Sequence, residues 1–191
     1  MAGERKTEVI GLLMSIERVG MENLVDYMTN EGDFFTAPCS TRFHLNGIGG
    51  LAEHSLNVLK QMRIWSNDEI KRDNSISNEN IIIVSLLHDL GKAYYRGKPN
   101  YIPNILKSGK ISEAKPFEIN KDRLCVPHEV VSLQIATKYI ELTEDEEFAI
   151  LYHNGLYVPS GRDLNGNERP LQTLLHHADL WVSRFVEKEM E

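Results

Sequence analysis

One apolar run that ends in a histidine and an aspartate most constrains how this chain can fold. Residues 81–87 read Ile-Ile-Ile-Val-Ser-Leu-Leu, and His88-Asp89 follows directly. The β-branched start is compatible with a buried strand. However, Ser77 or Asn78 can cap the start of a helix, and Gly91 can adopt the left-handed conformation in which many helices end. We therefore predict a buried helix with an imidazole and a carboxylate at its C-terminal end.

Burying that imidazole and an ionised carboxylate without partners costs several kcal/mol, roughly, and a bound cation offsets this cost. Other histidines and acids recur along the chain, and Asp179 interrupts an apolar run three residues after His176, on the same helical face. Neutral imidazoles and carboxylates are typical ligands of divalent transition metals. The candidate metal ligands are His54, His88, Asp89, His128, His153 and Asp179.

The remaining hydrophobic patterns predict a mainly helical protein. Asp68 to Asn80 is polar and is predicted to be a loop. Prolines and glycines exclude a long helix from 94–127, where we expect a loop with a hairpin around Ser108-Gly109. The further helices are predicted over residues 9–19, 22–28, 51–65, 128–140, 143–152 (with a Thr143/Glu146 capping box) and 171–189.

Composition places the chain among ordinary globular proteins, because 41% of its 191 residues are hydrophobic and 26% are charged. Two cysteines, far apart in sequence, are too few for a disulfide framework, and no stretch approaches the roughly 18 apolar residues of a membrane span. We therefore expect a cytoplasmic protein with no membrane partner. The net charge of −7 speaks against a general nucleic-acid binder, but residues 94–123 carry seven basic and three acidic side chains.

These residues resemble the signature of the HD superfamily of metal-dependent phosphohydrolases. Leu86-Leu-His-Asp-Leu-Gly-Lys-Ala is similar to its HDxGK form, and Gly49-Gly-Leu-Ala-Glu-His-Ser-Leu-Asn-Val to the GGLxEHxLxV element of its bacterial and phage branch. Phe35-Thr-Ala-Pro-Cys-Ser-Thr-Arg-Phe-His also resembles that branch, which includes 3′-to-5′ exoribonucleases with an HD domain. The resemblance implies an all-α HD-domain bundle with a loop or β-hairpin insertion after the His-Asp helix. We expect one domain over 1–191, with a core at about 33–185 and the insertion at 94–127.

The resemblance also implies a metal centre. His54, His88-Asp89 and Asp179 correspond to the signature ligands, and His128 and His153 lie in the order of residues that hold a second ion in two-metal members. One or two divalent ions are expected, among manganese, iron, cobalt, nickel, zinc and magnesium, with manganese or iron favoured. Such ions polarise phosphoryl oxygens and activate water.

Three residues are predicted to be catalytic: Asp89, Lys92 and Arg184. Substrate binding is assigned to Lys92, Tyr94, Arg96 and Lys98, which lie in or just before the basic segment. The predicted function is hydrolysis of phosphate esters of a nucleotide or of a nucleic-acid 3′ end, so the expected partner is a phosphorylated small molecule or a nucleic-acid end. The alternative is a non-catalytic module that senses nucleotide or metal. The sequence leaves the oligomeric state open.

Overall fold

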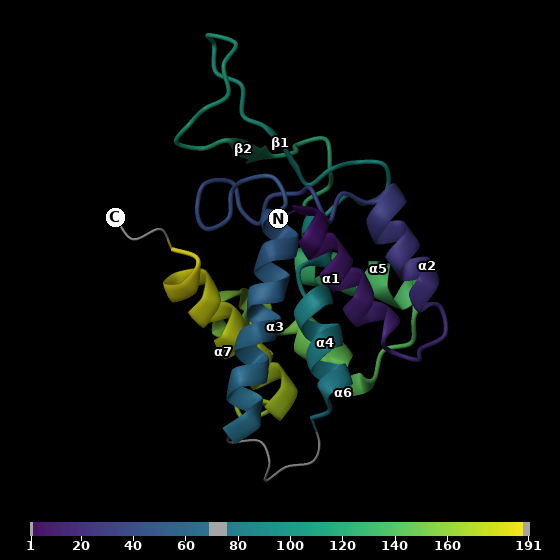
Figure 1. The fold of residues 1–191 in the computed structure, drawn as a ribbon. Coiled ribbons are helices and arrows are strands. Elements are labelled where there is room, and N and C mark those ends of the chain that lie inside the picture. Colours follow the sequence, from purple (N-terminus) through teal and green to yellow (C-terminus); the bar gives the residue numbers. More distant parts are fainter. Residues whose placement is uncertain (1, 69–75, 189–191) are drawn as a thin grey trace.

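A computed structural model describes residues 2–68 and 76–188, and shows a helical bundle with one small hairpin (Figure 1). The helices are α1 (Ala2–Met14), α2 (Met21–Asp26), α3 (Gly50–Asp68), α4 (Asn78–Leu87), α5 (His128–Tyr139), α6 (Glu144–Leu151) and α7 (Pro170–Trp181). Short 3-10 or π turns are η1 (Tyr27–Glu31), η3 (Leu90–Lys92), η4 (Gly155–Tyr157), η5 (Pro159–Leu164) and η6 (Val182–Val186). The strands are β1 (Tyr101–Pro103) and β2 (Phe117–Ile119).

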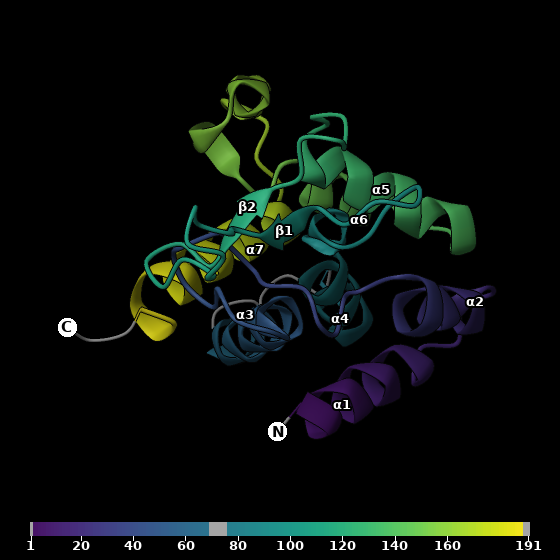
Figure 2. The same ribbon diagram turned by 90° about the horizontal axis from the view of Figure 1, so that it is seen from above.

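The apolar run forms the central helix of the bundle, as predicted. Residues 81–87 of α4 are all buried, and α4 packs against α1, α3, α6 and α7. Seen from above, α3 and α4 lie between α1 on one side and α5, α6 and α7 on the other (Figure 2). Ser77 caps α4, because its Oγ accepts from the Asn80 backbone N–H and the Asn80 side chain accepts from the Ser77 N–H. The predicted loop therefore ends before Asn78, and its residues 69–75 lie outside the described range.

The expectation for Gly91 is wrong. α4 ends at Leu87, and Gly91 lies in the 3-10 turn η3 without a positive φ. A Cβ on Gly91 would lie 2.0 Å from the backbone oxygen of His128 and 2.8 Å from the amide nitrogen of Ser132. Glycine is required here because η3 and the first turns of α5 approach one another backbone to backbone, rather than because the helix needs a left-handed end.

The first helix also differs from its prediction. α1 starts at Ala2 and ends at Met14, and Val19, assigned to the helix, is 95% exposed. The N–H groups of Ser15 and Ile16 bond to carbonyls three residues back, which tightens and ends the helix. Beyond this turn, Arg18 reaches the fully buried Glu146 of α6, at 2.8 Å. The chain therefore leaves the helix to make an ion pair with α6.

The C-terminal half and the insertion follow the predicted order. The Thr143/Glu146 capping box opens α6, and α7 continues through η6. Residues 94–127 contain the antiparallel pair β1–β2, with Tyr101 opposite Ile119, and the hairpin projects from the helical body (Figure 1). The Leu106 N–H donates to the Lys110 carbonyl and the Gly109 N–H donates to the Leu106 carbonyl, which closes the tip around Ser108-Gly109 and confirms the predicted turn. Among the described helices, none is both long and apolar enough to cross a membrane.

Candidate metal centre

The six predicted metal ligands meet at one place in the bundle, although they come from five parts of the chain. His54 lies in the second turn of α3, His88 and Asp89 at the end of α4, His128 at the first position of α5, His153 just after α6, and Asp179 in the last turn of α7. We call these six residues the His/Asp cluster. Its position follows from the fold, because α4 is central and its C-terminal end faces the starts or ends of its neighbours.

The first half of the His/Asp cluster contains His54, His88 and Asp179. Their ligand atoms all lie within 4.8 Å of one another. The His54 Nε2 lies 3.1 Å from the Asp179 Oδ1 and 3.7 Å from the Asp89 Oδ2. One divalent ion can therefore be reached by ligand atoms from three helices.

The second half lies on the other side of Asp89. His88, Asp89 and His153 form another group within 4.8 Å. The Asp89 Oδ1 lies 3.1 Å from the His128 Nε2 and 3.6 Å from the His153 Nε2, and the two Nε2 atoms lie 3.2 Å apart. Because the Oδ2 of Asp89 faces the first group and the Oδ1 faces the second, this carboxylate lies between two candidate ion positions.

Unpartnered polar atoms point to a cation at this place. Among the described residues, the His54 Nε2, the His88 Nε2 and the Asp89 Oδ1 are buried and have no hydrogen-bond partner. Each such atom costs about 1–3 kcal/mol if nothing satisfies it. All three belong to the His/Asp cluster, and imidazole nitrogens with carboxylate oxygens are the donor set that divalent transition metals accept. The residues present therefore fit a divalent ion.

Two of the histidines are oriented by backbone carbonyls. The Nδ1 of His88 donates to the Ser85 carbonyl at 2.9 Å, and the Nδ1 of His153 donates to the Ile150 carbonyl at 2.8 Å. These bonds direct each Nε2 lone pair into the His/Asp cluster. Burial lowers the pKa of His88 and lowers that of His153 to about 3. Both rings are therefore neutral, the form that ligates a metal.

Asp89, Asp179 and His54 are charged when no ion is bound. Burial raises the pKa of Asp89, but the Lys92 ammonium and the neighbouring His88 and His128 together outweigh burial and hold it well below its usual value. Burial likewise raises the pKa of Asp179, but His54 outweighs it and the net pKa is lowered. Burial opposes a charge on His54, yet the carboxylates of Asp179 and Glu187, which hydrogen-bond to its ring, raise its pKa well above the ordinary value. A metal ion must therefore displace a proton from His54.

The predicted catalytic residues outside the His/Asp cluster occupy different positions. The Lys92 Nζ lies 2.6 Å from the Asp89 Oδ2, and its side chain is 18% exposed, so it forms the edge of the cluster. Arg184 lies in η6, is exposed, and has no contact with the cluster among the described interactions. The structure thus brings Lys92, but not Arg184, to the candidate metal ligands.

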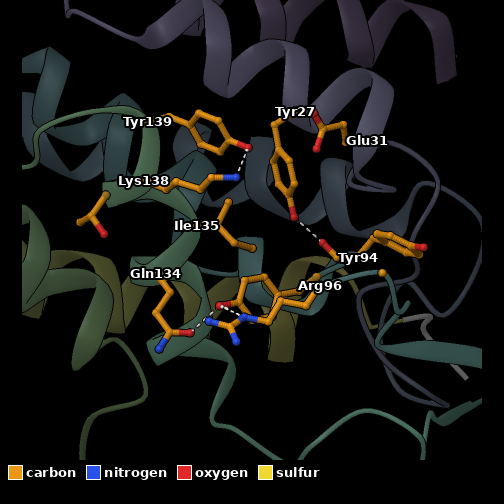
Figure 3. A pocket seen from close by; sticks show the side chains of 11 residues that line it. Tyr27, Glu31, Tyr94, Arg96, Gln134, Ile135, Lys138 and Tyr139 are labelled. Atoms are coloured by element: carbon orange, nitrogen blue, oxygen red, sulfur yellow. Dashed lines mark hydrogen bonds between the residues drawn. The ribbon is translucent and has the colours of Figure 1, made fainter.

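The predicted substrate-binding residues beyond Lys92 lie away from the His/Asp cluster. Tyr94 and Arg96 line a pocket of about 780 Å³ between η1 and the C-terminal half of α5, and no cluster residue lines it (Figure 3). Lys98 instead donates to the Asp122 carbonyl within the insertion. Tyr101 lies closer to the cluster, since its hydroxyl donates to the Cys39 carbonyl and burial raises its pKa to about 12. Tyrosines of the insertion therefore lie in two places: Tyr94 lines the pocket, and Tyr101 lies near the cluster.

Three residues beside the His/Asp cluster were missed by sequence reasoning. Cys39 and His44 lie within 4.8 Å of His54 as a third group, but both histidines of that group already contact the carboxylate of Glu187. Burial raises the pKa of the Cys39 thiol to about 11, so it is uncharged. Glu187 follows η6 in a charged tail, where no local pattern distinguishes it from a solvated residue.

Comparison with known protein families identifies the class. The model of the HD domain matches residues 51–181, which include all six residues of the His/Asp cluster and Lys92. The chain therefore belongs to the HD-domain family. No curated protein and no solved structure matched the chain. His44 and Glu187 lie outside the matched range.

Proposed function

We propose that the protein is a metal-dependent phosphohydrolase whose ion or ions are held by the His/Asp cluster. The convergence of three buried, unpartnered ligand atoms carries this proposal. His54, His88 and Asp179 hold one ion, and His128 and His153 hold a second one where it is present, with Asp89 between them. Manganese or iron suits this mixed imidazole and carboxylate set.

The chemistry divides between the ion and the chain's own side chains. A divalent ion supplies Lewis acidity, which polarises phosphoryl oxygens and makes water more acidic. Asp89 is ionised and lies between both groups, so it orients the site and accepts a proton from the attacking water. Because its pKa is so low, it is a weak base, and holding the ion is its larger role. Lys92, at the exposed edge, stabilises phosphate charge once substrate replaces part of its contact with Asp89.

For the substrate, we propose a phosphate ester of a nucleotide or of a nucleic-acid 3′ end. The support is the basic segment that follows η3 and the similarity of residues 35–58 to the branch with 3′-to-5′ exoribonucleases. Tyr101, whose hydroxyl donates to the Cys39 carbonyl, supplies an aromatic ring near the cluster for stacking against a base. Tyr94, Arg96, Lys98 and Arg184 would contact more distant parts of a longer substrate.

A panel of substrates tests the proposal. The purified protein with Mn²⁺ or Fe²⁺ is incubated with nucleoside mono- and triphosphates, cyclic nucleotides and short oligonucleotides. We expect turnover of at least one class by the wild type and by Asp163→Asn, an exposed control. We expect none by Asp89→Asn with its fold retained. A wild type that binds the metal but releases no product from any of these would favour the non-catalytic sensing module.

A further inference from the structure

The chain beyond α7 continues beside α3 and brings a carboxylate to His54 of the His/Asp cluster. η6 and the residue after it lie beside α3 (Figure 1). Glu187 ends this segment, and its side chain is only 2% exposed. A carboxylate so deeply buried requires partners, and all of its partners come from the segment before α3 and from α3 itself.

Glu187 accepts hydrogen bonds from three side chains. Its Oε2 lies 2.6 Å from the Nδ1 of His44 and 2.9 Å from the Nδ1 of His54. Its Oε1 accepts from the Asn57 amide at 2.9 Å. Because an ionised carboxylate can only accept, both imidazoles carry a proton on Nδ1. The Nε2 of His54 is therefore the nitrogen left for the cluster.

His54 differs from His88 and His153 in the partner of its Nδ1. His88 and His153 lie at helix C-terminal ends, where the last carbonyls have no intrahelical partner and accept the Nδ1 protons instead. His54 lies in the second turn of the 19-residue α3. There the Nδ1 of His54 bonds to the carboxylate of Glu187, which comes from another segment of the chain, and not to a carbonyl of α3.

We propose that Glu187 is a positioning residue: it holds the Nδ1 proton of His54 and orients the ring, so that Nε2 is presented to a divalent ion. This inference rests on the proposed function, because the divalent ion that His54 binds is the ion that supports hydrolysis in that proposal. A carboxylate behind a ligating imidazole also makes it a stronger donor, and loss of such a partner typically lowers metal affinity about 10- to 100-fold. The HD-domain match ends at residue 181, so this contribution comes from the chain outside it.

Zinc binding to the full-length protein tests the proposal. Zn²⁺ affinity is measured by competition with a chelator for the wild type, Glu187→Gln and Glu168→Gln, an exposed control with the same chemical change. We expect about a 10- to 100-fold loss for Glu187→Gln and no change for Glu168→Gln. An affinity of Glu187→Gln within twofold of the wild type would overturn the proposal.

Two further measurements separate positioning from a structural role. In the zinc-loaded protein, the downfield proton resonance of the His54 Nδ1–H is expected to be lost in Glu187→Gln, while those of His88 and His153 persist. His44→Gln removes the other histidine from Glu187 and should keep the zinc affinity within threefold. An unchanged His54 resonance, or an equal loss of affinity in His44→Gln, contradicts the proposal.

Failure of folding and failure of the enzymatic proposal remain distinguishable. If Glu187→Gln does not fold, Glu187→Asp keeps the charge but shortens its reach, and the same loss of zinc affinity is expected in smaller measure. Unchanged affinity in that variant counts against the proposal. A wild type that binds zinc but hydrolyses no phosphate ester removes only the hydrolytic assignment, whereas a wild type that binds neither Zn²⁺ nor Mn²⁺ removes both.

Discussion

Replacing Gly91 by alanine should push η3 away from α5, and so move His88 and Asp89, which precede η3, away from His128, which begins α5. The added Cβ would lie 2.0 Å from the His128 backbone oxygen, an atom held in the first turn of α5. The Gly91 N–H donates to the Ser132 Oγ at 2.8 Å, and that hydroxyl donates to the His88 carbonyl at 2.7 Å. Because backbone cannot move aside like a flexible side chain, η3 and α5 must separate, and both hydrogen bonds weaken.

The expected destabilisation follows from these contacts. Overpacking in a close-packed core costs about 1–3 kcal/mol, and each lost hydrogen bond about 1 kcal/mol. Gly91→Ala should therefore lower the free energy of unfolding by about 3 to 5 kcal/mol. Divalent metal affinity should fall too, because His88 and Asp89 precede η3 while His128 begins α5.

Urea denaturation of the metal-free protein measures this change, with Gly11→Ala as the matched control. Gly11 lies inside α1 with nothing within 4 Å of its added Cβ, so alanine should stabilise the protein by about 0.5–1 kcal/mol. A loss below about 1 kcal/mol for Gly91→Ala would refute the reasoning, since it would mean that the close approach of η3 and α5 relaxes at little cost.

Three further predictions concern charges and ligand linkage. Arg18→Met leaves the fully buried Glu146 without its cation, so the free energy of unfolding should fall by about 3 kcal/mol in urea melts; a change below about 1 would contradict this. Burial raises the pKa of Glu187, but His44 and His54 outweigh it and lower the pKa from 4.5 to about 2. Its stabilisation, at most about 3 kcal/mol, is therefore present above pH 4.5 and is lost as the pH falls towards 2; the loss of unfolding free energy between pH 6 and pH 3 should be smaller in Glu187→Gln than in the wild type, and an equal loss would contradict this. Mn²⁺ at 100 times its dissociation constant should stabilise the wild type by about 2.7 kcal/mol and should not stabilise Asp89→Asn, as thermal melts with and without EDTA will show.

The features that could be predicted from sequence have strong local causes. α4 follows from an uninterrupted apolar run with a capping serine, since both signals lie within a dozen residues. Asp179 could be selected because a carboxylate interrupts the apolar face of α7. The hairpin tip follows from Gly109, whose φ is +81°.

The features that were missed depend on tertiary contacts. The need for glycine at position 91 arises from the backbone of α5, which no pattern near residue 91 reveals. Glu187 acquires its role only because η6 packs beside α3 and brings this residue to His44, His54 and Asn57. Tyr94 and Arg96 follow Lys92 closely in sequence, but both line the pocket between η1 and α5 instead of the His/Asp cluster.

The most direct test of the metal centre is a titration of the metal-free protein with Mn²⁺, followed by electron paramagnetic resonance of the free ion. The wild type should take up one or two Mn²⁺ before the free signal rises, and both Asp89→Asn and Asp179→Asn should take up fewer. If the free signal of the wild type rises in proportion from the first addition, the His/Asp cluster does not hold a divalent manganese ion and the proposed chemistry has no basis.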